Sequence, residues 1–380
     1  MEGIKEIKYA TYYFPNYHID AHNESVHGKG WTEWELVKNA KPRFKGHYQP
    51  KIPLWGFEDE SDPKVMAKKI KTAKEYGIDC FIFDSYFYEN ENFLNGCLDN
   101  GFLKAENTND MGFALMWANH CWSNIHPATL DVVSEMEFDG IVSPKAFKRI
   151  TNEIINEYFT KPNYYRVDGK PYFSIYEIKM LERSLGGADG LKKALLEFRE
   201  DARKVVGEIH INALIGEISL LPNEKMDCGF NFLNQFDFDS YTSYCWLHHY
   251  EMPDFPVSSY NKCAKSYIKG LNYISCSTDK PYFPNITMGW DASPRTNQNG
   301  EFKKSDYPYS PVLKGNTPER FGKYLKKITK WAAANTNNPM VIINAWNEWT
   351  EGTYLEPDKK NGYEYLRQIR KVKNISDNNI

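Results

Sequence analysis

Short apolar segments alternate along the chain with segments of helical amphipathic spacing. The apolar segments are rich in β-branched and aromatic residues, as buried strands are. In chain order they cover residues 7–14, 78–83, 112–116, 171–175, 209–215, one segment placed within 230–246, then 285–288 and 340–343. An apolar stripe at helical spacing marks residues 61–77, 143–158, 190–206, 317–334 and 363–372. This alternation predicts an α/β fold in which eight parallel strands close into a (β/α)8 barrel, the TIM barrel.

The chain is expected to form one domain over residues 1–380, because it shows no linker-like change of composition and no internal repeat. Its tail, from about residue 374, is expected to fray. Residues 23–57 are rich in Gly, Trp, His and Pro and predict a long loop after the first strand, which is usually a functional feature. An open doubly wound sheet is the alternative fold, but no GxGxxG or P-loop sequence follows any strand segment.

Composition and charge narrow the class of partner. Lys and Arg total 47 against 50 Asp and Glu, a net charge of −3 with no long run of one sign, which favours neither nucleic acid nor an anionic membrane surface. Seven scattered cysteines without CxxC spacing favour free thiols in a reducing compartment. The first residues lack the apolar core of a leader, and no window approaches the roughly 18 apolar residues of a membrane span. A cytoplasmic protein is expected, unless a leader has been removed.

The segment at 340–358, MVIINAWNEWTEGTYLEPD, combines a strand with a dense group of functional side chains. Glu348, Glu351 and Glu356 follow the strand and are interleaved with indoles. Carboxyl groups act as acid and base on a glycosidic bond, and aromatic faces cover the C–H faces of a sugar ring. The 15% aromatic content agrees with such platforms. The segment therefore predicts chemistry on an oligosaccharide or polysaccharide, with these three glutamates as the candidate acid and base groups.

Further polar and aromatic residues lie at the ends of the other strand segments. Functional sites of such barrels gather at the carboxyl ends of the strands. The candidates for substrate binding are Tyr13, His18, Trp31, Trp34, His47, Asp84, Trp117, Asn119, His120, Trp290, Asp291, Arg295, Trp346, Asn347 and Trp349.

Each candidate also has a purely structural explanation. Glu348 and Glu351 could be solvated loop carboxylates, Asp291 and Arg295 could simply pair with each other, and Asp84 could bind neighbouring backbone amides. The aromatic residues could simply pack in the core. Because the six candidate tryptophans lie in polar loop sequences, about half of them are expected to face a cleft instead.

A metal site is not predicted. His18, His47 and His120 are the candidate ligands, but their spacing gives no support for a metal, and no other cofactor is expected.

The segments YYFPNYH, GKGWTEW, FKGHYQP, YGIDCFIFD, WANH, GWDASPR and WNEWTEG make the chain similar to the glycoside hydrolase family 99-like proteins, also described as WbsX-type glycosyltransferases. The resemblance extends over about residues 8–358. Family 99 proper consists of (β/α)8 enzymes that cleave α-mannosides, mostly endo-acting and with retention, and its NEWxEG motif supplies both catalytic carboxylates. By motif position, the resemblance implies that Glu348 assists attack by the sugar's own 2-hydroxyl through an epoxide-like intermediate, and that Glu351 is the general acid/base. Neither a protein nucleophile nor a metal is then required, and the sugar has a 2-hydroxyl trans to the leaving group, as in an α-mannoside or α-rhamnoside.

Two positions depart from the family pattern. Many WbsX-type members have an acidic residue where this chain has His120, and an aromatic, histidine-rich YYHYW where this chain has Asp84. The sugar subsites are therefore expected to differ from those of family 99 proper.

The function expected from the sequence is a retaining glycoside hydrolase. One alternative is a glycosyltransferase or transglycosylase of O-antigen-like polysaccharide assembly, although no nucleotide-binding glycine loop or DxD motif follows a strand segment. A non-catalytic sugar-binding barrel is a further alternative.

Overall fold

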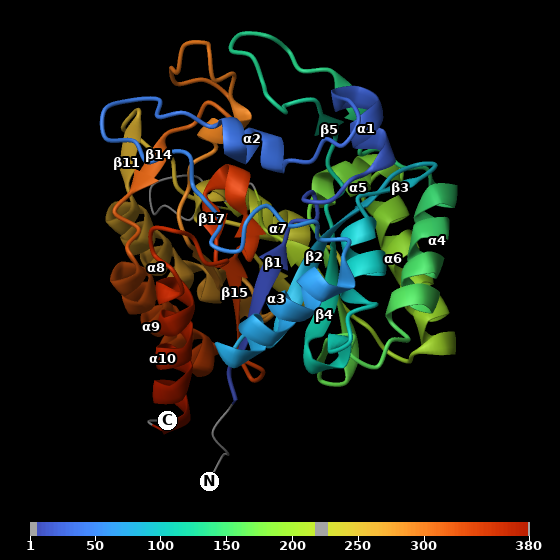
Figure 1. Ribbon diagram of the computed structural model, residues 1–380. Coiled ribbons are helices and arrows are strands. Elements are labelled where there is room, and N and C mark those ends of the chain that lie inside the picture. Colours follow the sequence, from blue (N-terminus) through green and yellow to red (C-terminus); the bar gives the residue numbers. More distant parts are fainter. Residues whose placement is uncertain (1–5, 217–226, 379–380) are drawn as a thin grey trace.

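A parallel sheet curls into a barrel in the computed structural model, which describes residues 6–216 and 227–378 (Figure 1). The path of hydrogen-bonded neighbours contains nine strands, all paired in parallel. In chain order they are β1 (Lys8–Tyr13), β2 (Cys80–Phe87), β4 (Gly112–Trp117), β8 (Lys170–Ile175), β9 (His210–Leu214), β10 (Ser240–Thr242), β12 (Tyr282–Phe283), β13 (Asn285–Thr287) and β15 (Met340–Asn344).

The barrel closes at Pro284, which separates β12 from β13. β12 pairs with β10, and β13 pairs with β15, so the two short strands are halves of one strand that joins the ends of the sheet. The strand is interrupted at Pro284 because proline has no N–H to donate to a neighbouring strand. The Pro284 carbonyl still accepts a hydrogen bond from the Ile342 N–H at 3.0 Å. Counting the halves as one gives eight strands, which confirms the predicted (β/α)8 barrel.

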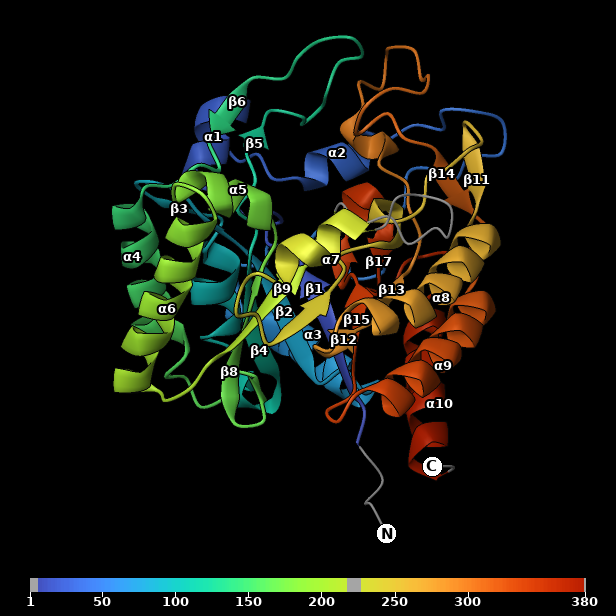
Figure 2. The same cartoon turned by 180° about the vertical axis from the view of Figure 1, so that it is seen from behind.

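Helices pack around the outside of the barrel (Figures 1 and 2). The long ones are α3 (Pro63–Glu75), α4 (Pro144–Glu153), α6 (Ala188–Val205), α8 (Tyr260–Ser277), α9 (Pro318–Asn335) and α10 (Glu364–Asn378). Asp62, Ser143 and Thr317 cap the first, second and fifth of these, each followed by proline at the first helical position. Five of the six coincide with predicted segments, whereas α8 was not predicted. Helix α10 continues to Asn378, beyond its predicted end at residue 372, and residues 379–380 of the expected tail lie outside the described residues.

The expected long loop after β1 contains two short helices, α1 (Ala21–His27) and α2 (Trp34–Asn39). The Asp20 side chain caps α1. This cap is a local helix signal, but the Gly and Pro content of the stretch predicted a loop. In both overall views α1 and α2 lie at the end of the molecule opposite to the end of α10. They therefore cover the carboxyl ends of the barrel strands, where the site is expected.

Short elements complete the described chain. They are β3 (Asn92–Phe93), a π-helical turn (Cys97–Phe102), β5 (Trp122–Ser123), β6 (Met136–Phe138), a second π-helical turn (Ile154–Tyr158), β7 (Arg166–Val167), α5 (Ile178–Ser184), α7 (Asp227–Leu233), β11 (Val257–Ser259), β14 (Val312–Lys314), β16 (Asn347–Glu348), β17 (Thr353–Tyr354) and four 3-10 turns, at Thr108–Asp110, Trp246–His248, Ser293–Arg295 and Trp349–Glu351. No described helix is both long and apolar enough to cross a membrane.

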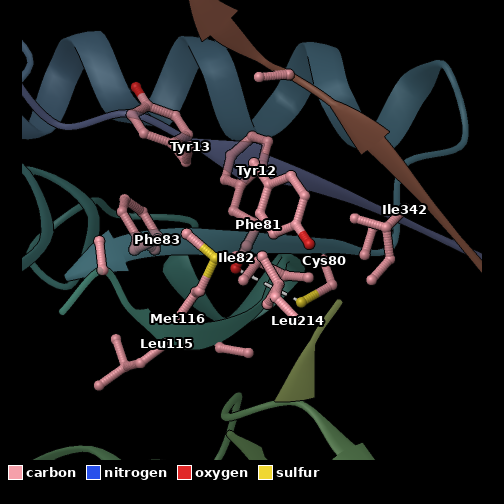
Figure 3. Packing of buried hydrophobic residues seen from close by; sticks show 14 of the residues in the cluster. Tyr12, Tyr13, Cys80, Phe81, Ile82, Phe83, Leu115, Met116, Leu214 and Ile342 are labelled. Atoms are coloured by element: carbon pink, nitrogen blue, oxygen red, sulfur yellow. Dashed lines mark hydrogen bonds between the residues drawn. The ribbon is translucent and has the colours of Figure 1, made fainter. Parts of the chain in front are cut away.

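The barrel interior is filled by apolar and aromatic side chains (Figure 3). Tyr12, Ile82, Leu214 and Ile342 come from four different strands and are at most 3% exposed. Burial of side chains of this size stabilises a fold by roughly 1.5–3 kcal/mol each. The packed interior is therefore no channel, and the space for a ligand lies above it, among the loops.

Candidate active site

A cavity of about 740 Å³ opens at the carboxyl ends of the barrel strands. Its wall joins residues from the ends of β2, β4, β8 and the loops that follow β10, β13 and β15. The polar and aromatic side chains that line it include Asp84, Tyr86, His120, Trp122, His126, Tyr176, Tyr244, His248, Trp290, Arg295, Tyr307, Glu348 and Glu351.

Glu348 and Glu351 lie on a tight turn after β15. Glu348 ends the short strand β16, and the 3-10 turn Trp349–Glu351 follows directly. Gly352 ends the turn at φ 67°, a left-handed conformation that favours glycine. A Cβ at this position would also lie 2.9 Å from the Asp291 Cβ. The turn brings both carboxylates to the cavity, although they are only 2% and 7% exposed.

One guanidinium joins the two glutamates. Arg295 Nη2 lies 2.9 Å from Oε1 of Glu348, and Nη1 lies 2.9 Å from Oε1 of Glu351. A third carboxylate, Glu33 of the loop after β1, accepts from Arg295 Nε at 2.8 Å. The alternative that Arg295 merely pairs with Asp291 is thus wrong, because Arg295 lies between three buried glutamates.

These charges are unevenly compensated. Burial raises the pKa of Glu348 well above its ordinary value, and the negative charge of Glu351 adds to the rise while Arg295 opposes it. Burial also raises the pKa of Glu351, which Arg295 and a hydrogen bond from Tyr307 hold back. For Glu33, burial is outweighed by Arg295 and His126, so that its pKa is lowered. The catalytic candidates consequently bind protons more readily than ordinary glutamates.

Each of the two glutamates has one carboxylate oxygen outside these contacts. Oε2 of Glu348 and Oε2 of Glu351 are buried and have no hydrogen-bond partner among the described residues. Buried carboxylate oxygens are normally satisfied. Their position on the cavity wall therefore suits contact with a bound substrate.

A second polar group lies on another part of the cavity wall. Asp84 accepts from the Tyr244 hydroxyl at 3.0 Å through Oδ2, while its buried Oδ1 has no described partner. Burial raises the pKa of Asp84 well above the ordinary range, and the charge of Glu351 contributes to the rise. His120 Nδ1 lies 2.9 Å from the carbonyl oxygen of Cys121. Because a carbonyl only accepts, Nδ1 carries the proton and Nε2 is an acceptor.

Most of the aromatic candidates do not line the cavity. Among the six candidate tryptophans only Trp290 lines this cavity, fewer than the half that were expected to face a cleft. The indole N–H groups of Trp34, Trp117 and Trp349 donate to Glu58 O, Phe87 O and Glu356 Oε2, at 2.8, 2.9 and 2.7 Å. Trp31 stacks on His27, and Tyr13 and Trp346 are fully buried in the core. Nearby acceptors and core packing direct these rings away from the cavity.

Several polar candidates also lie elsewhere. Asn119 bonds the backbone of Glu177, and Asn347 bonds the backbone of Phe14. His18 is 2% exposed and does not line the cavity. These residues shape the loops around the site. The described residues contain no cluster of three or more His, Cys, Asp or Glu side chains suited to a metal ion.

His47 and Asp291 line a separate cavity of about 340 Å³. Asp291 Oδ2 accepts from His47 Nε2 at 3.0 Å and from Gln49 Nε2 at 2.8 Å, and it is paired with Lys51. Burial alone would raise the pKa of Asp291, but Lys51 and His47 outweigh it and hold this pKa well below the usual range. These contacts join Asp291 to the loop after β1, and Asp291 does not line the larger cavity.

Several residues of the site were missed in the sequence. Glu33 lies inside the GKGWTEW segment, in which the two tryptophans were predicted to bind substrate and the acid between them was not. Tyr307 comes from an irregular loop, and its hydroxyl donates to Glu351 Oε1 at 2.7 Å. No local pattern marks Tyr307 as functional, because its role arises only from a contact 44 residues along the chain.

Comparison with known families agrees with this architecture. The family model described as "Glycosyltransferase WbsX" matches residues 9–369. The chain belongs to the WbsX family. This WbsX-family chain is 28% identical over 376 residues to the uncharacterized protein WxcX of Xanthomonas campestris pv. campestris, in an alignment that covers 95% of the chain and 49% of WxcX. The chain thus spans about half the length of the curated relatives it matches.

Solved structures share the fold of this WbsX-family protein. The GH99 endo-alpha-mannosidase from Bacteroides thetaiotaomicron superposes with a TM-score of 0.62 at 15% identity, covering 98% of this chain and 97% of that enzyme. A structure described as a glycoside hydrolase-like protein gives a TM-score of 0.63 at 16% identity, with 98% and 95% covered. At these identities the likeness establishes the fold.

Proposed function

We propose that this protein is a retaining glycoside hydrolase that cleaves an α-linked oligosaccharide or polysaccharide. The observation that carries the proposal is the pair Glu348 and Glu351, which share Arg295 and each offer a free oxygen to one cavity. Most glycoside hydrolases use a pair of carboxyl groups to hydrolyse the glycosidic bond. The resemblance to family 99 adds the expectation of an α-mannoside- or α-rhamnoside-like substrate.

In the proposed reaction, Glu348 accepts the proton of the sugar's 2-hydroxyl while that oxygen attacks the anomeric carbon. Glu351 donates its proton to the leaving oxygen as the glycosidic bond breaks. Water then opens the epoxide-like intermediate at the anomeric carbon and gives its proton to Glu351, and the 2-oxygen takes back the proton held by Glu348. Two inversions give retention, and both carboxyl groups return to their starting states.

Burial raises the pKa of both glutamates, so the two proposed roles depend on Arg295 to keep Glu348 ionised. Burial raises the pKa of Glu351, which favours the protonated form that a general acid needs. Glu348 has to be ionised before it can accept a proton, and Arg295 is the group that favours its ionised form. Glu33 accepts from the same guanidinium and is itself kept ionised, so it orients Arg295 toward the pair.

The test is a screen of α-mannosides, α-rhamnosides and other α-glycans with product analysis, followed by substitution of the pair. Glu348→Gln and Glu351→Gln are each expected to lower kcat by about 10²–10⁴-fold while the protein still folds and binds sugar. Glu351→Gln is expected to retain activity on an aryl glycoside whose leaving group needs no proton, whereas Glu348→Gln loses activity on both substrates. Glu319→Gln, an exposed glutamate in the first turn of α9, is the control. Activity on the α-glycan substrate within about tenfold of wild type in either catalytic variant contradicts that residue's role.

A glycosyltransferase or transglycosylase is the second candidate, because the family model carries a glycosyltransferase description. Such an enzyme binds an activated donor. Thermal-shift measurements with sugar nucleotides beside free oligosaccharides separate the two, since a ligand at 100 times its Kd stabilises the folded protein by about 2.7 kcal/mol. Stabilisation by a sugar nucleotide alone favours transfer, and sugar binding without turnover indicates a binding barrel.

A further inference from the structure

The residues on both sides of Glu348 are tied to buried carboxylates. Asn347 donates from Nδ2 to Oε1 and Oε2 of Glu60, at 2.9 and 3.2 Å. Trp349 donates from Nε1 to Oε2 of Glu356 at 2.7 Å. Glu60 is fully buried and Glu356 is 4% exposed. The backbone that carries Glu348 is thus held through its two neighbours.

A single cation joins these two carboxylates. Lys69 of α3 places Nζ 2.5 Å from Glu60 Oε1 and 2.5 Å from Glu356 Oε1, and its side chain is 1% exposed. Nζ also lies 5.8 Å from the centre of the Tyr13 ring. Lysine is almost never buried to this extent unless it is paired. A helix on the outside of the barrel therefore supplies the charge beneath the proposed catalytic turn.

The charge of Lys69 lies between the two carboxylates and opposes protonation of Glu60. Burial and the charge of Glu356 raise the pKa of Glu60 to about 7 against this effect of Lys69. Without the ammonium group, two carboxylates would face each other in a dry environment, and one would take up a proton or move away. Hydrogen bonds to charged acceptors are roughly twice as strong as neutral ones. Loss of the charge would therefore weaken the bonds from Asn347 and Trp349.

We propose that Lys69 is a positioning residue for Glu348. It fixes Glu60 and Glu356, they fix Asn347 and Trp349, and the turn between those two residues keeps the Glu348 carboxylate against Arg295. The inference rests on the proposed catalytic role of Glu348. Catalytic groups have to be held within about 0.5 Å of their productive position, so a small shift of this turn lowers kcat before it alters binding.

The first test replaces Lys69 by methionine, which keeps the length of the side chain and removes the charge. Lys69→Met is expected to lower kcat at least tenfold with KM within about twofold, and Lys69→Arg to restore part of the loss. The control is Lys68→Met, the neighbouring residue on α3, whose ion pair with Glu58 lies at the surface. Equal kcat values for Lys69→Met and Lys68→Met overturn the proposal.

A second pair of variants decides the matter should Lys69→Met fail to fold. Trp349→Phe removes the N–H that reaches Glu356, whereas Trp346→Phe removes an N–H with no described partner from an equally buried indole of the same segment. Both substitutions leave a similar void, so their difference reports the hydrogen bond. Trp349→Phe is expected to lower kcat about tenfold more than Trp346→Phe, and equal losses overturn the proposal.

A crystal structure separates this inference from the proposed function. Should the wild-type protein hydrolyse none of the glycans, the hydrolase proposal has failed, but Lys69→Met still tests the positioning. In a crystal of that variant, or of Trp349→Phe, Glu348 Oε1 is expected to leave Arg295 Nη2, which lies 2.9 Å away in the wild-type protein. An unchanged contact in the variant overturns the role of Lys69 whatever the reaction is.

Discussion

The Tyr307 hydroxyl donates a hydrogen bond of 2.7 Å to Oε1 of Glu351, and the same oxygen accepts a hydrogen bond from Arg295. This bond favours the ionised form of Glu351. Tyr307→Phe is therefore expected to raise the pKa of Glu351 further, because the ionised carboxylate loses a hydrogen bond. With Glu351 as the general acid, the basic limb of the pH profile of kcat/KM moves to higher pH.

The control for this prediction is Tyr309→Phe. The Tyr309 hydroxyl donates to the backbone carbonyl of Ala128 and reaches no carboxylate. Its pH profile is expected to match that of the wild-type protein. A shift of the basic limb to lower pH in Tyr307→Phe would contradict the assignment of Glu351 as the acid.

Removal of Arg295 is expected to destabilise the protein in a pH-dependent way. Arg295→Met leaves Glu33, Glu348 and Glu351 buried without their cation, which costs about 3–5 kcal/mol for a broken buried pair. The pKa values of the three carboxyl groups then lie above those in the unfolded chain, so the folded protein binds more protons and loses stability as pH rises. Urea unfolding at pH 5 and pH 8 is expected to show the larger loss at pH 8; a larger loss at pH 5 would refute this picture.

Asp84→Asn is expected to flatten the dependence of stability on pH. The raised pKa of Asp84 means that the wild-type protein loses stability as pH rises from about 4, the ordinary value, toward the folded value. Asparagine mimics the neutral acid and can still accept from Tyr244. The difference in melting temperature between Asp84→Asn and the wild-type protein should therefore become more positive as pH increases. Asp110→Asn, at an exposed ion pair with Lys74, is the control and should show no such gain.

The opposite sign is expected at Asp291. Its pKa lies below the usual range, so its contribution to stability is present above about pH 4 and is lost as pH falls toward the folded value. Lys51→Met removes the cation beside this carboxylate and is expected to cost about 3 kcal/mol at pH 7, with a smaller cost at pH 3. Urea unfolding at the two pH values measures the difference. An equal cost at both would show that Lys51 acts by packing alone.

The sequence predicted the barrel because its signals are local. Apolar runs and helical stripes report which segments are strands and helices, and caps such as Asp62 and Thr317 mark where helices begin. The turn with Glu348 and Glu351 was found for the same reason, since both residues lie directly after one strand. Helix α8 was missed although its buried residues follow helical spacing, because most of that stripe is tyrosine, cysteine, alanine and glycine, which mark a helix less clearly than leucine or isoleucine.

Which residues meet at the cavity was decided by the tertiary structure alone. Glu33 and Arg295 are separated by 262 positions and come together only when the barrel closes. The strand-end position of Trp349 was visible in the sequence, but the direction of its side chain was not, although its acceptor lies only seven residues away. The acceptor on Glu356 turns its indole into the core. Local pattern determines secondary structure, whereas side-chain direction and charge pairing depend on contacts that form only in the folded chain.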